Sequence, residues 1–508
     1  MGAAVGADRP IEGYTLAQRL SSEYQTLVIS PRSYFVFTPL LNSTSVGTLE
    51  FRTALEPVRS RQKPNIEFIQ GWGDDVDFAS KTVTVEENVV DQRQGKAQTE
   101  DRYEDHTVGQ KRTAQNTMRK EGKRFKVPYD KLVITVGCYS QTFGTPGVKE
   151  NAYFQKDVGD ARRIRKRILE CFETASLPSI SDKLREQLLR FAVVGGGPTG
   201  MEFAAELRDL VHEDLSKLYP ELVPKVRIAV LDVAPKVLSM FDDKLGKYAM
   251  DAFRREGVEV KTSHHVKELR PGLPRSKGEE GMDEVQDSQG CYTLNTEEEG
   301  DIGIGMCVWS TGLMMNPFIE KALSKSYKLP PTCTVADPAH KDQEWTIEKN
   351  PKTGALIVDE KLRVQLVSQS TTSSSSSKED SQQGEYPTAT TPLTDVFALG
   401  DNANIRSTQL PATAQTASQQ AIWLGRRLNK NDLEQKSFSF TNMGVMAYLG
   451  DKKSIVQTGG PFGNISGWVA WLIWRGAYLT KSVSWRNKIL IPTYWFLNWA
   501  FGRDITRF

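Results

Sequence analysis

Three consecutive segments decide the fold of this chain: Phe191-Ala-Val-Val194, Gly195-Gly-Gly-Pro-Thr-Gly200 and the helix-forming Met201–Leu210. An apolar run, a G-x-G-x-x-G loop and a helix in this order are the fingerprint of a dinucleotide-binding unit. The glycines let backbone N–H groups approach a pyrophosphate, and the helix N-terminus turns its positive dipole end toward the phosphates. We therefore predict that three glycines of the loop contact a nucleotide: Gly195, Gly197 and Gly200.

The next apolar run, Arg227–Leu231, ends at Asp232. In a dinucleotide-binding unit an acidic residue at this place accepts a hydrogen bond from the ribose 2′-OH. It lies 32 residues beyond Gly200 instead of the usual ~20, because residues 208–225 lengthen the crossover. A carboxylate repels the 2′-phosphate of NADPH, so the sequence predicts binding of NADH.

Apolar runs alternate with helix-forming segments along most of the chain, at 131–135, 227–231, 305–309 and 396–399. This alternation is typical of a doubly wound α/β protein. At roughly 150 residues per domain, the 508 residues suffice for about three domains. The formal net charge of +2 gives no basic field for a nucleic-acid partner, and no apolar stretch reaches the ~18 residues of a spanning helix.

Three polar stretches, 91–125, 270–300 and the Ser-rich 368–391, are expected to be surface insertions between strands. The five cysteines and five histidines lack the spacings of a zinc ribbon or a dithiol redox centre. His264 and His265 follow an alternating run and are expected to end a strand. We expect no metal site.

A second group of glycine motifs indicates a flavin. The apolar strand 396–399 ends in Gly400-Asp401, where an aspartate can accept hydrogen bonds from a ribityl chain and the glycine admits the cofactor. Thr135-Val-Gly137 and Ser310-Thr-Gly312 each close a strand, in the manner of the crossing loops of reductases that bind two dinucleotides.

Together these motifs resemble the two-dinucleotide-binding flavoprotein superfamily. More narrowly, the chain resembles the type II (alternative, non-proton-pumping) NADH:ubiquinone oxidoreductases of mitochondria. The resemblance runs from about residue 13 to the C-terminus and is carried by six segments: 30–41, 46–50, 195–207, 397–402, 411–420 and 484–508.

The resemblance implies two Rossmann-like domains and a C-terminal amphipathic section that attaches to a membrane. The expected divisions are 1–165 and 316–435 for the two parts of the FAD-binding domain, 185–315 for the NADH-binding domain and 436–508 for the membrane-anchoring section. The implied enzyme is a rotenone-insensitive-type NADH dehydrogenase, peripheral to the mitochondrial inner membrane. It passes a hydride from NADH to FAD and two electrons on to ubiquinone, pumps no protons, and is expected to be a homodimer.

The family pattern also assigns individual residues. Thr38, Pro39 and Leu40 would line the isoalloxazine, and Ala414, Gln415 and Gln419 would lie between flavin and quinone. The remaining FAD contacts would be Gly13, Gly137, Gly312, Gly400 and Asp401. Gln415 and Gln419 share one helical face, which is either an ordinary polar face or a donor pair for a quinone carbonyl.

Glu202 lies in the first turn of the helix that follows the glycine loop. It is expected either to contact the nicotinamide ribose or only to complement the helix dipole. With Gln415 and Gln419 it completes the residues to which a catalytic role is assigned.

The N-terminus departs from the family pattern. Gly13 matches the last glycine of the family's first glycine loop, but Met1–Glu12 supplies neither an apolar strand nor the first glycine pair, and no presequence is visible. Either the chain is truncated or mis-started, or it has lost the cradle for the flavin phosphates. In the second case it would be a flavin-free, NADH-binding peripheral membrane protein. A related flavin reductase with another acceptor is a further alternative.

The last 48 residues are rich in aromatic and basic side chains: they hold six of the ten tryptophans, and six basic residues face one acidic residue. An aromatic stripe is often part of a core, but beside a basic rim it is also the signature of a helix lying at a membrane interface. The residues predicted to meet the lipid surface are Trp468, Trp471, Trp474, Trp485, Arg486, Trp495 and Trp499.

Overall fold

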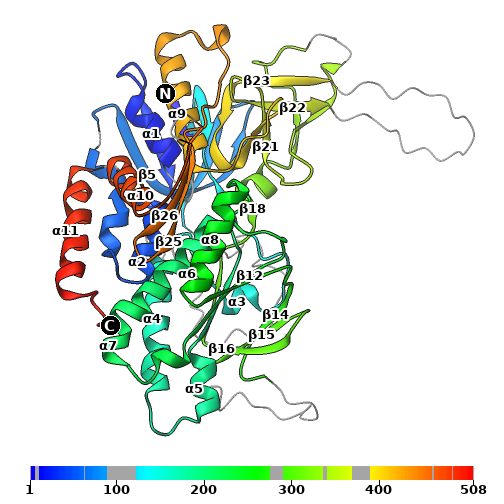
Figure 1. Ribbon diagram of the computed structural model, residues 1–508. Coiled ribbons are helices and arrows are strands. Elements are labelled where there is room, and N and C mark those ends of the chain that lie inside the picture. Colours follow the sequence, from blue (N-terminus) through cyan, green and yellow to red (C-terminus); the bar gives the residue numbers. More distant parts are fainter. Residues whose placement is uncertain are drawn as a thin grey trace, which may run out of the picture.

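The computed structural model describes residues 2–5, 11–61, 63–88, 122–274, 290–335, 340–368, 389–459, 463–482 and 484–506. Two sheets built around parallel strands form two α/β units, and the last part of the chain adds a small antiparallel sheet and two helices (Figure 1). The predicted doubly wound α/β class is confirmed. Most of the predicted insertions 91–125 and 368–391 lie outside the described residues.

The first sheet has a parallel centre flanked by antiparallel strands. Its parallel strands are, in spatial order, β23 (Thr390–Ala398), β8 (Lys131–Ile134), β1 (Gly2–Val5), β2 (Thr26–Ser30) and β5 (Ile66–Asp77). The antiparallel strands are β6 (Thr82–Glu87) and β7 (Arg124–Pro128) on one side and β22 (Arg363–Ser368), β20 (Glu344–Ile347) and β19 (Ser326–Lys328) on the other. Leu132, Ile134 and Phe397 are fully buried in this unit.

The strand β1 corrects one prediction, because Met1–Glu12 does supply a strand. Ala3 pairs with Leu27 of β2 on one side and with Leu132 of β8 on the other. The strand was missed because its residues are small. Hydrogen bonds to both neighbours, which any backbone can make, place it in the sheet. Residues 6–10, between β1 and α1 (Ile11–Arg19), lie outside the described residues.

The second sheet is parallel throughout. Its spatial order is β10 (Tyr153–Phe154), β17 (Met306–Trp309), β11 (Arg190–Val194), β12 (Arg227–Asp232) and β13 (Val258–Thr262). A separate antiparallel sheet consists of β14 (Val266–Pro271), β15 (Tyr292–Thr296) and β16 (Gly300–Ile304). The prediction of a loop over 270–300 is therefore wrong for its last part, where Thr293 and Leu294 are buried in a central strand.

Helix α6 (Pro198–Leu210) is surrounded by protein, with ten of its thirteen residues buried. It packs against β11 and β12 of its own sheet, against α2 (Leu41–Ser45) of the first unit, and against β25 (Val445–Gly450) of the C-terminal section. The first-unit helix α2 is itself fully buried and also packs on α4 (Val158–Ala175). Helix α6 therefore joins three parts of the chain that are distant in sequence.

The C-terminal section begins with an antiparallel sheet of β25, β26 (Lys453–Gln457) and β27 (Asn464–Gly467). Helix α10 (Trp468–Lys481) follows and packs on β26, and α11 (Trp485–Phe501) forms one edge of the molecule (Figure 1, red). Within the described part of the chain, neither of these helices nor any other is both long and apolar enough to cross a bilayer.

Candidate functional site

A cavity of about 380 Å³ lies where the two α/β units meet helix α10. Its walls come from the turn at 38–42, the N-terminus of α6, the ends of β17 and β23, and Tyr478 of α10. Seven residues singled out in the sequence line it: Thr38, Pro39, Gly197, Glu202, Gly312, Asp401 and Ala414. The structure therefore brings the predicted nucleotide loop and the predicted flavin motifs to one place.

The glycine loop has the geometry that its sequence predicts. Gly197 is the N-cap of α6, and Pro198 occupies the first helical position. A Cβ added to Gly200 would lie 2.0 Å from the carbonyl oxygen of Gly195, so a side chain there would push the helix off the loop. A Cβ at Gly197 would meet nothing within 4 Å, so the loop leaves open space beside the helix N-terminus.

Asp232 ends β12 beside this loop, as predicted. Its Oδ2 accepts a hydrogen bond from the N–H of Gly196, and its Oδ1 accepts one from the N–H of Ala234 at 2.7 Å. The carboxylate therefore fixes the glycine loop and the following turn at the edge where an adenosine ribose would lie.

On the flavin side, two buried amides that the sequence did not single out position the predicted motifs. Asn402 accepts from the N–H of Gly137 at 3.2 Å and donates to the carbonyl oxygen of Ile134 at 3.2 Å, which ties the ends of β8 and β23 together. Gln420 of helix α9 (Ala414–Lys430) accepts from the N–H of Gly400 at 2.7 Å. Both side chains are at most 1% exposed.

The cavity also contains unused hydrogen-bond acceptors. The side-chain oxygens Asn42 Oδ1 and Gln155 Oε1 are buried and have no hydrogen-bond partner among the described residues, and both residues line the cavity. Buried acceptors are rarely left unpaired. The imide N–H of a flavin and the carboxamide of a nicotinamide are donors of the matching kind, so the residues present fit both groups.

Helix α9 begins at Ala414 with Thr413 as its N-cap. Its N-terminus faces the cavity, because Ala414 lines it. The amides of Gln415 and Gln419, however, are engaged with the segment that leads into β25. Gln415 accepts from the N–H of Met443 at 3.2 Å, and Gln419 both accepts from and donates to the backbone of Thr441.

Glu202 has a role that neither interpretation of the sequence included. It is 5% exposed and accepts hydrogen bonds from Asn42 Nδ2 at 3.1 Å, the N–H of Tyr448 at 3.0 Å and Trp474 Nε1 at 3.1 Å. These donors belong to α2, β25 and α10. Burial raises the pKa of Glu202 to about 7, against the effect of the three hydrogen bonds.

Trp474 corrects another prediction. It was assigned to the lipid-facing stripe, but it is 5% exposed, stacks on Tyr448 with ring centroids 5.2 Å apart, and donates to Glu202. The three-residue spacing of Trp468, Trp471 and Trp474 turns successive side chains by about 60°. The stripe therefore runs from the exposed Trp468 to the core.

One group of side chains has metal-ligand atoms close together. Ligand atoms of His265, Glu297 and Glu298 lie within 4.8 Å of one another, but all three residues are exposed. His265 Nδ1 pairs with Glu298 at 2.8 Å and Lys267 pairs with Glu297 at 2.6 Å. These ion pairs account for the arrangement without a metal ion.

Two segments of the chain match known families. Residues 12–327 match the family described as pyridine nucleotide-disulphide oxidoreductase, and residues 442–504 match the NDH2 C-terminal domain. The chain belongs to the pyridine nucleotide-disulphide oxidoreductase family. With the C-terminal match, this confirms the predicted resemblance to type II NADH dehydrogenases. All five cysteines of this family member are buried and none forms a disulfide.

Proteins of this kind resemble the chain over nearly its whole length. It is 37% identical over 503 residues to a probable NADH dehydrogenase of Dictyostelium discoideum, covering 97% of this chain and 89% of that protein. It is 31% identical over 493 residues to the mitochondrial external NADH-ubiquinone oxidoreductase 2 of Saccharomyces cerevisiae, covering 95% and 78%. The fold matches that of NDH2 from Plasmodium falciparum in complex with NADH, with a TM-score of 0.73, 20% identity and 99% of both chains covered.

We predict that Glu202→Gln removes a pH dependence of stability. The pKa of Glu202 is raised from 4.5 to about 7, so between these values the folded protein binds more protons than the unfolded chain. The contribution of Glu202 to the free energy of unfolding therefore falls as the pH rises from about 4.5 to 7. In urea unfolding experiments, the free energy of unfolding of the variant minus that of the natural protein should increase by on the order of 2 kcal/mol from pH 5 to pH 8.

The matched control is Glu320→Gln, which removes an exposed carboxyl group. Its unfolding free energy should differ from that of the natural protein by a constant amount across the same pH range. If Glu202→Gln also gave a curve parallel to that of the natural protein, Glu202 would not be a neutralised buried acid.

Proposed function

We propose that this chain oxidises NADH and passes two electrons through bound FAD to ubiquinone at a membrane surface, without pumping protons. The observation that carries the proposal is the single cavity in which the nucleotide loop, the flavin motifs and the C-terminal helix α10 meet. A reductase that couples two dinucleotides needs the two reactive rings side by side. The alternative of a flavin-free relative depended on the absence of a first strand and of the first glycine pair, and β1 supplies the strand.

The NADH end of the site would use the loop at 195–200 and Asp232. The N-terminus of α6 would bind the pyrophosphate with its free N–H groups and positive dipole end. Asp232, which already accepts a hydrogen bond from the glycine loop, would also accept one from a ribose hydroxyl. The nicotinamide would then enter the cavity beside Gly197 and Gly312, where its carboxamide can reach the unpaired acceptor of Gln155 or Asn42.

The flavin end would use residues of the first α/β unit. Thr38, Pro39 and Leu40 would line the ring, while Asp401 and the loops at Gly137, Gly312 and Gly400 would bind the ribityl chain and pyrophosphate with Gly13 of α1. When bound, FAD supplies the chemistry that links a two-electron hydride donor to a quinone. The N-terminus of α9 at Ala414 would stabilise negative charge on the nearby ring edge.

The quinone would approach from the side of α10 and the start of α9. We retain Gln415 and Gln419 as candidate donors to a quinone carbonyl. In this structure their amides bind the backbone at 441–444, so a quinone would have to replace those contacts. Tyr478 of α10 lines the cavity on this side.

We further propose that α10 and α11 lie on the surface of the mitochondrial inner membrane, and that the chain forms a homodimer as its family resemblance implies. Support for the membrane contact comes from exposed side chains on both helices: Trp468, Leu472, Trp485, Ile489, Phe496, Trp499 and Phe501. Lys481 and Arg486 are exposed beside them, whereas Arg503 is buried against Asp214. The mitochondrial designation of the Saccharomyces relative supports the location.

The function is tested with the full chain loaded with FAD, using NADH and a short-chain ubiquinone. We expect NADH-dependent quinone reduction with a preference for NADH over NADPH. In Asp232→Asn, kcat/KM for NADH should fall about ten-fold or more through loss of a charged hydrogen bond, and the preference over NADPH should narrow. The control Asp243→Asn alters only an exposed carboxylate at the start of α8 (Asp243–Arg255). FAD-loaded protein that does not reduce quinone would refute the proposal.

Membrane attachment is tested by flotation with phospholipid vesicles. The double variant Trp485→Ala/Trp499→Ala removes two indoles that are 76% and 77% exposed, and we expect its bound fraction to fall several-fold. The control Leu177→Ala/Leu218→Ala removes exposed apolar side chains elsewhere on the molecule and should float like the natural protein. Equal losses in both double variants would contradict attachment through α10 and α11.

A further inference from the structure

The guanidinium group of Arg475 is held between two tryptophan rings. Its Cζ lies 4.2 Å from the ring centroid of Trp471, one turn earlier in α10, and 4.3 Å from that of Trp495 in α11. Contacts of this kind orient a planar guanidinium group and hold it in place. They supply no acceptor for its five N–H donors.

Arg475 has neither a hydrogen-bond acceptor nor an ion-pair partner among the residues that the structure describes. The side chain is half-buried, and this burial lowers its pKa, against the opposite effect of the carboxylates of Glu206 and Glu213, neither of which forms an ion pair with it. Withdrawing a charge from water in this way is costly unless an opposite charge is supplied. The arrangement is therefore that of a preformed anion contact.

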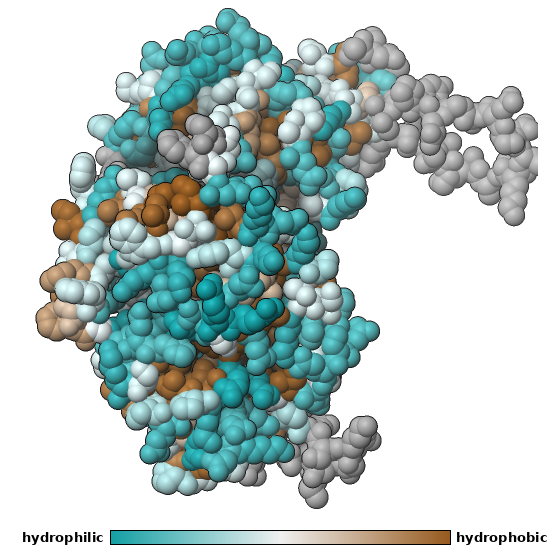
Figure 2. Space-filling view, in the orientation of Figure 1, coloured by the Kyte–Doolittle hydropathy of each residue, from teal (hydrophilic) through white to brown (hydrophobic). Residues whose placement is uncertain are grey.

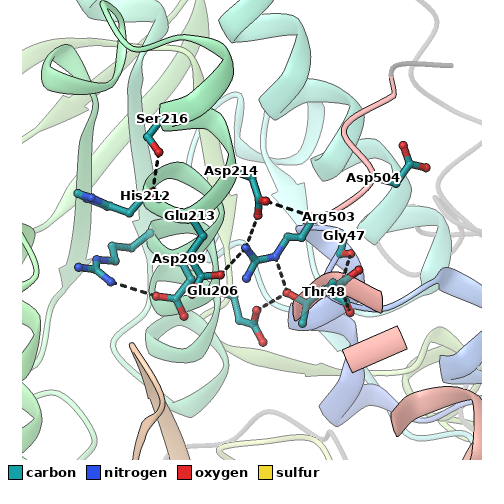
Figure 3. A network of polar contacts seen from close by, with 12 residues as sticks. Gly47, Thr48, Glu206, Asp209, His212, Glu213, Asp214, Ser216, Arg503 and Asp504 are labelled. Carbon is teal, nitrogen blue, oxygen red and sulfur yellow. Dashed lines mark hydrogen bonds and ion pairs between the residues drawn. The ribbon is translucent and has the colours of Figure 1, made fainter. Parts of the chain in front are cut away.

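Arg475 lines a pocket of about 670 Å³ between α10, α11 and the end of α6. The carboxylates in this pocket already have donors. Glu206 accepts a hydrogen bond from the hydroxyl of Ser43 at 2.6 Å. It accepts another from Thr48 at 2.8 Å, and Arg503 pairs with Asp214 at 2.6 Å and with Glu213 at 2.8 Å (Figure 3). Two further cations without a printed ion pair, Lys217 and Lys452, also line the pocket but are exposed, whereas Arg475 is half-buried. The carboxylates make the pocket unfavourable for a ligand with several negative charges.

The mouth of the pocket is apolar and exposed. Trp468, Trp499 and Phe501 line it and are 59%, 77% and 82% exposed. Hydrophobic residues gather along the side of the molecule that α10 and α11 form (Figure 2). A ligand that fits both parts carries one phosphate for Arg475 and an apolar portion that covers these side chains.

We propose that this pocket binds the head group of a zwitterionic membrane glycerophospholipid, with its phosphodiester on Arg475. The acyl chains would lie on the apolar mouth, and the head-group ammonium would face the carboxylate side of the pocket near Glu213. Inorganic phosphate could bind Arg475 but has no apolar portion to cover the exposed side chains at the mouth of the pocket. We therefore assign the site to a lipid. The inference rests on the membrane attachment proposed above and adds a single defined lipid site to it.

The test is isothermal titration of the delipidated full chain with dihexanoyl phosphatidylethanolamine below its micelle-forming concentration. We expect saturable binding of one lipid per chain. In Arg475→Gln the affinity should fall at least ten-fold, the loss expected for a hydrogen-bonded charge pair, and Arg475→Lys should bind more weakly than the natural protein because it lacks the planar fork. Inorganic phosphate and octyl glucoside, which carry only one half of the ligand, should not bind saturably.

The matched control is Arg486→Gln, which removes the same charge from an exposed position at the start of α11. It should bind the short-chain lipid within two-fold of the natural protein. Equal binding by Arg475→Gln and Arg486→Gln would overturn the proposal. Saturable binding of inorganic phosphate with the same affinity as the lipid would overturn the assignment to a lipid.

A measurement on the natural protein covers the case in which Arg475→Gln does not fold. Phenylglyoxal modifies accessible arginines, and peptide mapping should show Arg475 protected by the short-chain lipid but not by octyl glucoside. Unchanged modification would refute the lipid site. Protein that reduces ubiquinone and floats with vesicles, yet binds no short-chain lipid, would refute this inference and leave the proposed function standing.

Discussion

The constraint on which the structure depends is the burial of three carboxylates on one helix. Glu202, Glu206 and Asp209 follow one another at four and three residues along α6 and therefore share a face. Buried carboxylates must receive hydrogen bonds, because an unpaired one costs several kcal/mol. Their donors come from α2, β25 and α10. The hydrogen bonds donated to the carboxylates of α6 thus hold the first α/β unit and the C-terminal section against the nucleotide-binding unit.

This constraint also positions walls of the central cavity and of the pocket that Arg475 lines. The end of α6 that carries Glu202 lines the central cavity, and the end that carries Glu206 and Asp209 lines the pocket beneath α10 and α11. Helix α10 takes part in both places: Tyr478 lines the cavity and Arg475 lines the pocket. We propose that NADH oxidation and quinone reduction share one cavity, and that α10, which forms one of its walls, also contacts the membrane surface.

Patterns over a few neighbouring residues predicted the nucleotide-binding strand, loop and helix. They did not predict the contacts between segments that are distant in the sequence. The strand, loop and helix at 191–210 follow from periodicity and glycine spacing, which act over a few residues. Strand β1 was missed because Gly2–Val5 is not strongly apolar. The donors of Glu202 lie between 160 and 272 positions away, and the spacing of Trp474 could not distinguish core from lipid. Only the fold reveals these pairings.

The claim of a shared cavity is tested most directly by anaerobic rapid mixing of the FAD-loaded full chain with NADH, followed at about 450 nm, where oxidised flavin absorbs. The account predicts that the flavin bleaches in a single turnover at least as fast as steady-state catalysis, and that ubiquinone alone restores the colour. A flavin that stays oxidised in the presence of NADH would contradict it.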